Sequence, residues 1–132
     1  MAAVLHMYLT SAGYTDVIVE SAGVGDYAKT GGKPAPFGVA AAKFLGLHIG
    51  GHTRRHVETL KLDDYDLFVC AADDVARELL KFCGDRSRMF NANVANPFPV
   101  QFQQDYEPCM IAILGGMYRV VARYFPPQSF EM

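Results

Sequence analysis

The spacing of one cysteine and one arginine is the first pattern in the chain that could do chemistry. A loop with the spacing CX5R wraps a phosphate group, and a thiolate in such a loop can attack phosphorus. The segment Cys83–Arg88 has the spacing CX4R, which is one residue short. Cys83 is therefore predicted to end a helix. Cys70 lies inside an apolar run and Cys109 lies in the last predicted helix, so neither is expected to be a nucleophile.

Three histidines four positions apart could suggest a metal site. His48, His52 and His56 would face one way on a continuous helix, but Gly50 and Gly51 lie between them. Zinc needs three or four convergent ligands. No cysteine or acidic residue is spaced to complete such a set, so the sequence predicts neither a metal nor another cofactor.

Two glycine-rich patterns resemble nucleotide-binding motifs but are incomplete. The segment 23–28 fits GxGxxA, yet it continues into a loop that ends near Pro34 and does not open a helix, as a dinucleotide motif must. Gly32 and Lys33 are followed by Pro34, where a P-loop needs Ser or Thr. Neither nucleotide motif is therefore predicted to function.

Composition and charge restrict the class of protein. The chain has 132 residues, of which 51% are hydrophobic, which suits a single folded domain. A net charge of −2 disfavours a nucleic-acid or anionic-membrane binder, because such proteins carry a clustered basic face. No run approaches the ~20 apolar residues of a membrane span. The three cysteines form no disulfide framework, which favours a cytoplasmic protein.

Helix and strand signals alternate along the chain and predict an α/β domain with a three-layer parallel sheet. The expected helices are residues 3–12, 37–45, 73–82 and 105–124; the expected strands are residues 17–19, 65–72 and, more weakly, 89–91. The run 65–72 is almost continuously apolar, which is typical of a strand covered on both faces. Asp73 or Asp74 is expected to cap the helix that follows, with Phe82 facing inward. In the last helix, apolar residues share one stripe that should face the core; these are Tyr106, Met110, Ile113, Leu114, Met117, Val121 and Tyr124.

A series of short matches in a fixed order carries a family resemblance. They are Ser21-Ala22-Gly23, Asp26-Tyr27, Leu47, His52 with Arg55, Asp66, Cys70 and Asn96-Pro97 with Phe98. In this order and spacing, the chain from Met1 to about Tyr124 resembles the low-molecular-weight protein tyrosine phosphatases, a family that includes the related arsenate reductases. The resemblance implies a flavodoxin-like fold and hydrolysis of phosphotyrosine through a cysteinyl-phosphate.

The resemblance also implies that a catalytic segment precedes residue 1. Met1-Ala2-Ala3-Val4 matches the helix opening that follows the family's first strand and its CX5R loop. We therefore expect residues 1–132 to be one N-terminally truncated phosphatase-like domain that is inactive as given. With the loop restored, the expected partner is a phosphotyrosine protein or a small phosphate ester. A fragment of an arsenate reductase and a noncatalytic, phosphatase-shaped binding module remain alternatives.

The resemblance assigns roles to five residues. Ser21 and His52 match positions that support the catalytic loop, and Tyr27 and Phe98 match the aromatic walls of the phosphotyrosine cleft. Asn96 occupies the place of the family's general-acid Asp, where an amide can donate a hydrogen bond but cannot give up a proton at neutral pH. Asn-Pro also favours a turn, so a purely structural role for Asn96 stays open.

Overall fold

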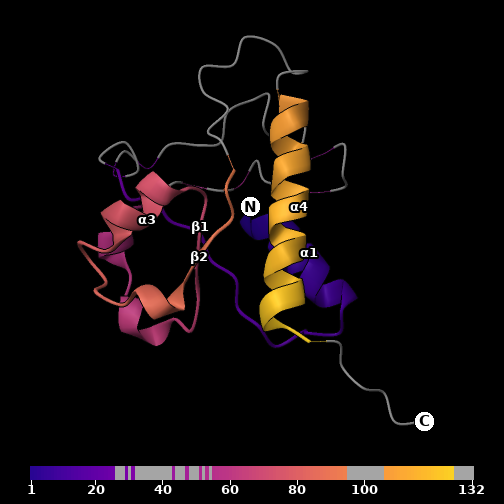
Figure 1. The fold of residues 1–132 in the computed structure, drawn as a ribbon, viewed down its shortest axis with the longest axis horizontal. Helices are drawn as coiled ribbons and strands as arrows, with labels where there is room; N and C mark the ends of the chain where they lie inside the picture. The colour runs from indigo at the N-terminus through magenta and orange to yellow at the C-terminus, as the bar shows by residue number, and fades with distance from the viewer. Residues whose placement is uncertain are drawn as a thin grey trace.

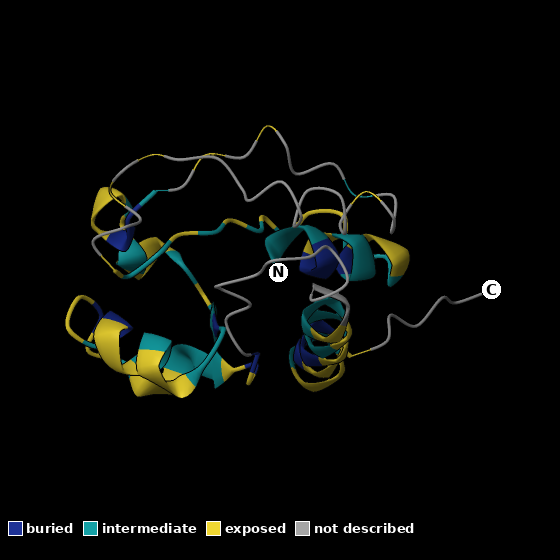
Figure 2. Ribbon diagram, turned by 90° about the horizontal axis from the view of Figure 1, so that it is seen from above, coloured by how far each residue is buried: buried dark blue, intermediate teal, exposed yellow. Residues whose placement is uncertain are grey.

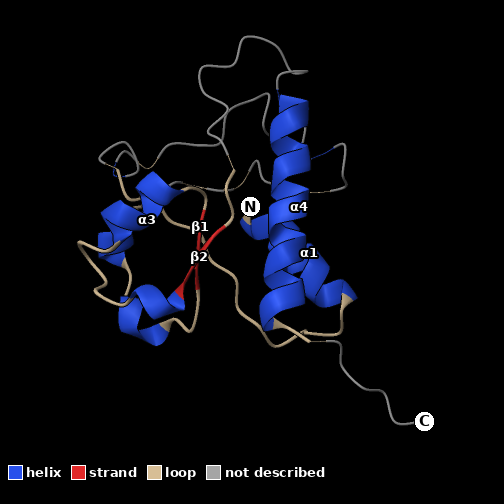
Figure 3. Ribbon diagram, in the orientation of Figure 1, coloured by secondary structure: helices blue, strands red, loops and turns tan. Residues whose placement is uncertain are grey.

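The computed structural model describes residues 1–25, 29, 31, 43, 47, 51, 53, 55–94 and 106–126. Within these residues the helices are α1 (Ala2–Ser11), α3 (Asp73–Leu79) and α4 (Tyr106–Tyr124), and the strands are β1 (Phe68–Cys70) and β2 (Met89–Asn91). Short 3-10 helices occupy Val57–Thr59, Leu62–Asp64 and Arg86–Arg88. The helices α1 and α4 lie together to one side of the two strands, and α3 lies to the other (Figures 1 and 3). The expected helix 37–45 and most of the loop before it fall outside the described residues.

The two strands form a small parallel sheet joined by α3. Phe68 pairs with Met89, and Cys70 pairs with Asn91. The predicted strand 89–91 is thus confirmed. The predicted strand 65–72 is shorter than expected. Both of its faces are covered, as predicted, because Val69 packs against one apolar cluster while Phe68 and Cys70 contribute to another, although Phe68 and Val69 are only half-buried. Within the described part of the chain β1 pairs along one edge only, so its other edge has no strand partner there.

The predicted strand 17–19 does not form. Residues 14–22 have no regular secondary structure, and the pairing nearest to them is a single parallel bridge between Gly23 and His56. Val17 and Val19 still pack against the buried apolar cluster that contains Val4 and Leu9, whereas Ile18 is 81% exposed. A β-branched run becomes a strand only when a neighbour completes its hydrogen-bond ladder, and no described segment does so here.

Buried apolar residues form two separate clusters (Figure 2). The larger lies between α1, α4 and the segment after β2; its buried members are Val4, Leu5, Leu9, Ala92, Val94, Met117 and Val120. The smaller lies between β1, α3 and the first 3-10 helix, and contains Val57, Cys70 and Leu79. The larger cluster therefore fixes α1, whose N-terminal end borders the site described below.

The ends of α1 and α3 differ in how they are capped. After α1, Gly13 adopts a φ of 91°, a left-handed conformation that suits glycine, and the chain turns back there. The prediction that Asp73 or Asp74 caps α3 was wrong. Ala72 is the N-cap and makes no side-chain cap bond, while both aspartates lie in the first turn, where their charges favour the helix dipole. Phe82 lies beyond the end of α3 and is 40% exposed, so its predicted inward position was also wrong.

The predicted inner stripe of α4 is confirmed from Ile113 to Tyr124, whereas Met110 is half-buried and is not among the side chains that pack against the larger cluster. Met117 is fully buried, and Ile113, Leu114, Val121 and Tyr124 pack against the larger cluster. None of the described helices is long and apolar enough to span a membrane.

Helix α4 approaches the backbone after β2 very closely at Gly116. A Cβ atom at Gly116 would lie 3.1 Å from the carbonyl oxygen of Ala92 and 3.3 Å from its Cβ. The Arg119 guanidinium donates to the same carbonyl oxygen over 2.7 Å. A Cβ atom at the neighbouring Gly115 would meet nothing within 4 Å. Packing therefore requires a glycine at position 116 but not at position 115.

The two glycines give a matched pair of stability variants. Gly115→Ala should stabilise the chain by about 0.5–1 kcal/mol, because alanine favours the helix. Gly116→Ala gains the same propensity but crowds a backbone oxygen, so we expect a net loss of about 1–3 kcal/mol. Urea unfolding followed by circular dichroism measures both. A shift of the two midpoints in the same direction would show that α4 does not approach Ala92 this closely.

Candidate functional site

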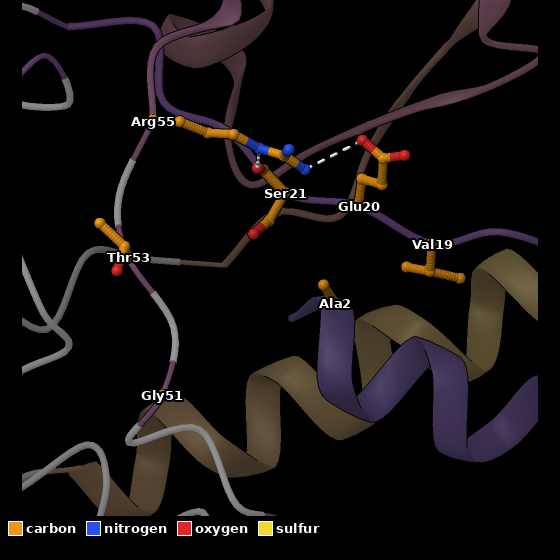
Figure 4. Close-up of a pocket in the computed structure, with 7 residues that line it drawn as sticks. All are labelled: Ala2, Val19, Glu20, Ser21, Gly51, Thr53 and Arg55. Atoms are coloured by element: carbon orange, nitrogen blue, oxygen red, sulfur yellow. Dashed lines mark hydrogen bonds and ion pairs between the residues drawn. The ribbon is translucent and has the colours of Figure 1, made fainter. Parts of the chain in front are cut away.

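A pocket of about 440 Å³ lies beside the N-terminal end of α1. Its lining residues come from three parts of the chain: Ala2 from α1; Val19, Glu20 and Ser21 from the irregular segment 14–22; and Gly51, Thr53 and Arg55 (Figure 4). The first segment is positioned by the packing of α1 on α4, because Val4 and Leu5 are buried in the larger cluster. The start of a helix offers unpaired N–H groups and a positive dipole end, which favour an anion.

Ser21 is the one predicted site residue that the structure places, and it lines this pocket. Its side chain points toward the space bordered by Ala2 and Thr53 (Figure 4). Its carbonyl oxygen accepts a hydrogen bond of 2.9 Å from the Nε of Arg55. The backbone that carries the Ser21 hydroxyl is therefore held by a side chain from another segment.

Arg55 holds the segment 20–23 through both its side chain and its backbone. Its Nη2 lies 2.9 Å from the Oε2 of Glu20 in an ion pair. Its carbonyl oxygen accepts from the Gly23 N–H over 2.9 Å, and the Gly23 carbonyl in turn accepts from the Val57 N–H over 3.0 Å. These bonds fix the position of Ser21 relative to the residues around position 55.

Tyr65 adds a third polar group to this arrangement. Its hydroxyl donates to the Oε2 of Glu20 over 2.6 Å. Because this hydrogen bond to the Glu20 carboxylate stabilises the protonated phenol, the pKa of Tyr65 is raised above its ordinary value. Sequence reasoning did not foresee the group formed by Glu20, Arg55 and Tyr65. These residues are far apart in the chain, and opposite charge alone does not say which of many such residues will meet.

His56 is buried and uses both ring nitrogens. Its Nδ1 accepts from the Glu58 N–H over 3.1 Å, so the ring proton lies on Nε2, which donates to the Val24 carbonyl over 3.0 Å. The ring also contacts Phe82 edge-on, with centroids 5.3 Å apart. This histidine therefore holds the segment after Ser21 and has no lone pair left for a metal. Among the described residues, no group of three or more histidine, cysteine or acidic side chains could hold a metal ion.

The cysteines do not contribute to the pocket lining. Cys70 is buried in β1 and Cys109 is half-buried in α4, and burial raises the pKa of both thiols. Cys83 is buried four residues beyond the end of α3, so the prediction that it ends a helix was wrong; its N–H donates to the Leu79 carbonyl. The sulfur of Cys83 lies 4.0 Å from Nη2 of Arg88, whose other guanidinium nitrogens bond Asp85 and the Tyr65 carbonyl. That arginine is engaged in structural contacts.

The other four predicted site residues lie outside the described residues. They are Tyr27, His52, Asn96 and Phe98. Their roles stay predictions.

The α-amino group of Met1 is buried at the N-terminal end of α1. Burial removes water from the ammonium form and lowers the pKa of this group below its ordinary value of 8.0. A charge is thus desolvated where α1 meets the rest of the domain. A peptide bond at the same place would carry no such charge.

This burial predicts a pH dependence of stability for the chain with a free Met1 amine. Between the lowered folded-state pKa and 8.0 the unfolded chain binds more protons, so the free energy of unfolding should rise with pH across that window. It should level off once the amine is neutral in both states. The raised pKa values of Cys70 and Cys109 act only above 9.0, outside the window.

Urea midpoints at a series of pH values measure this effect. An N-acetylated chain, in which the amine is absent, is the control and should lack the rise. An identical rise in both chains would assign the pH dependence to another group.

The sequence profile of the low molecular weight phosphotyrosine protein phosphatase family matches residues 1–96. The chain therefore belongs to this family, and the resemblance inferred from the sequence is confirmed. No curated protein sequence matches the chain.

Several solved structures share the fold. Wzb from Vibrio vulnificus, solved with benzylphosphonate, is 17% identical with a TM-score of 0.78, and the match covers 92% of this chain and 86% of that one. A protein tyrosine phosphatase from Entamoeba histolytica, a product-state mimic, is 15% identical with a TM-score of 0.79, over 98% and 88% of the two chains. The low molecular weight protein tyrosine phosphatase of T. tengcongensis is 18% identical with a TM-score of 0.77, over 92% and 87%. At these identities the likeness shows a common α/β fold.

Proposed function

We propose that this chain is the body of a phosphotyrosine phosphatase domain, and that the pocket beside α1 receives a phosphate-binding loop. The observation that carries the proposal is the place of Ser21. In a chain whose family profile covers residues 1–96, this serine lines a pocket at the N-terminal end of α1. A helix start and a hydroxyl together suit a loop that surrounds an anion.

The proposed chemistry needs a CX5R loop directly before α1. Its thiolate would attack phosphorus to form a cysteinyl-phosphate and expel the tyrosyl oxygen, and water would then hydrolyse that intermediate. Loop amides and the arginine would bind the phosphate oxygens. Within this scheme Ser21 and His52 hydrogen-bond the loop, and Arg55 holds the backbone of Ser21. The described cysteines are poor substitutes, because none of them lines the pocket.

The proposed loop also requires a strand that leads into it. We propose that the strand leading into the loop pairs between residues 17–19 and β1, which completes a three-layer, flavodoxin-like sheet in a single domain. Val17, Val19 and Val69 support this placement, because all three pack against the larger cluster although no described strand joins them. Residues 1–132 would then be an N-terminally truncated form of the domain.

The proposed substrate is a phosphotyrosine side chain of a protein, or a small aryl phosphate. Tyr27 and Phe98 would form the aromatic walls of its cleft. The benzylphosphonate bound to the Vibrio vulnificus relative has an aromatic ring and a phosphonate, as an analogue of phosphotyrosine should. A binding module without turnover is the second candidate, favoured by the lack of a cysteine in the described pocket lining.

Adding the missing segment tests the proposal. Residues 1–132 should hydrolyse neither phosphotyrosine peptide nor p-nitrophenyl phosphate. The same chain preceded by an apolar strand of ~5 residues and a CX5RSP loop should hydrolyse both. Its matched control replaces only the loop cysteine by serine and should have no activity.

Two outcomes would overturn the proposal. One is turnover by residues 1–132 that survives alkylation of all three cysteines. The other is an extended chain that folds and binds vanadate but hydrolyses neither ester, which would favour the binding module. Arsenate reduction in place of phosphatase activity would favour the arsenate reductases of the family.

Asn96 supplies a separate prediction for the extended chain. The phenol of tyrosine has a pKa near ~10, so its departure without a proton is slow, and general acid catalysis contributes ~10²–10⁴-fold. Asn96→Asp should therefore raise phosphotyrosine turnover at least ~10-fold, equivalent to ~1.4 kcal/mol. The effect on p-nitrophenyl phosphate should be smaller, because nitrophenolate leaves without help. Equal and small effects on both substrates would mean that position 96 transfers no proton.

A further inference from the structure

The outer face of α4 carries a line of exposed apolar residues. They are Pro108, Ile111, Gly115, Tyr118 and Ala122, and all five are exposed. Their separations alternate between three and four positions, so they form one line along the helix. Ile111 is 70% exposed and Tyr118 is 67% exposed. We call these five residues the outer stripe; the exposed residues of α4 lie on the side away from α1 (Figure 2).

Helix α4 is apolar on its inner face as well. Its inner residues pack against α1 and the segment after β2, and the only charged residues in the range 108–126 are Arg119 and Arg123. A solvent-exposed helix of a monomer normally has a polar outer face, and a helix that is apolar all round is normally covered all round. The outer stripe therefore has the composition of a covered surface.

The order of residue sizes in the outer stripe is complementary to its own reverse: read backwards, each large residue stands where a small one stood. Large and small residues alternate as Ile111, Gly115, Tyr118 and Ala122. If a second copy lies antiparallel, Ile111 faces the partner's Ala122 and Tyr118 faces the partner's Gly115. Each large side chain then meets a small one, and two-fold symmetry repeats both contacts. Gly115 has open space where a Cβ would lie, so the partner's ring has room there.

A parallel copy would fit less well. It would place Tyr118 against the partner's Tyr118 and Gly115 against the partner's Gly115, which crowds one level of the contact and leaves a gap at the other. It would also align two helix dipoles that an antiparallel pair opposes. Shape and dipole therefore favour the same antiparallel arrangement.

The two arginines do not oppose such a contact. Arg119 donates to the Ala92 carbonyl over 2.7 Å. The guanidinium of Arg123 lies 6.0 Å from the ring centroid of Phe90 and 5.3 Å from that of Tyr124. Both charges are thus bound to their own domain, and neither belongs to the outer stripe. Two copies can meet along it without bringing like charges onto the line of contact.

The outer stripe is smaller than a standard protein–protein interface. An aromatic residue buries ~150–250 Å², so the stripe offers roughly 400–500 Å² per copy, compared with about 800 Å² per partner in a standard interface. We propose that the outer stripe is the contact surface of a weak, antiparallel homodimer. No pocket-lining residue belongs to α4, so both pockets of the dimer stay open. The dimer is thus independent of the proposed catalytic function.

Sedimentation velocity of residues 1–132 tests this proposal between about 1 and 200 µM, a range suited to an interface below standard size. We expect a shift from monomer to dimer with rising concentration. Ile111→Glu and Tyr118→Glu should each weaken association at least ~10-fold, because they place a charge in an apolar contact. Ile18→Glu is the matched control: it changes an isoleucine that is even more exposed than Ile111 (81% against 70%) but lies outside the outer stripe, and should leave association unchanged.

An exchange of sizes tests the antiparallel register itself. Gly115→Leu should weaken association at least ~10-fold by filling the space for the partner's Tyr118. The double variant Gly115→Tyr with Tyr118→Gly pairs the same sizes in reverse and should recover association, while Gly115→Tyr alone should not. Circular dichroism confirms that each variant is folded.

Three results would overturn the proposal. They are a monomer at every concentration, an association that Ile18→Glu abolishes and Tyr118→Glu does not, and a double variant no better than Gly115→Tyr alone. A monomer that Tyr118→Glu destabilises would show that a segment of the same chain covers the outer stripe. The phosphatase assays do not involve the outer stripe, so either proposal can fail without the other.

Discussion

The contact between α4 and the backbone at Ala92 is the constraint on which the described structure depends. Because Gly116 has no side chain, α4 can lie close to the Ala92 backbone. Arg119 donates a hydrogen bond to the Ala92 carbonyl oxygen at the same point. With α4 in this place, Met117 and Val120 complete the larger cluster together with Val4, Leu5 and Leu9 of α1. The position of α1, and hence one wall of the pocket, follows from a close approach made at the other end of the sequence.

Sequence reasoning succeeded where the signal is local. The 3.6-residue period identified α1 and α4, and the ordered matches identified the family. It failed where the outcome depends on a distant neighbour. Val17, Ile18 and Val19 have strand propensity, yet a strand needs a ladder partner that no described segment supplies. The bonds from Tyr65 and Arg55 to Glu20 have no sequence signature, because their geometry exists only after folding.

The pocket combines the N-terminal end of α1, which favours an anion, with a paired acidic and basic side chain, Glu20 and Arg55. The Glu20 carboxylate accepts hydrogen bonds from both Arg55 and Tyr65. The Arg55 guanidinium is therefore already paired with a carboxylate of its own domain. Two contacts hold the backbone that carries the Ser21 hydroxyl. They are the hydrogen bond from the Arg55 side chain to the Ser21 carbonyl and the parallel bridge between Gly23 and His56. In the proposed function these residues would support a phosphate-binding loop, and none of the described cysteines lines the pocket. Family membership and catalytic competence are separate properties in such a chain.

The division of the interior into two clusters has a consequence for local unfolding. The smaller cluster has only three buried residues, worth roughly 1.5–3 kcal/mol each, so it can open at less cost than the larger one. Two backbone bonds, from Ala92 to Cys70 and from Val94 to Ala71, connect the regions that hold the two clusters. The amides of α3 should therefore exchange with solvent through a local opening that leaves α1 and α4 packed. In that open form the Cys70 thiol meets water while the pocket wall formed by α1 keeps its shape.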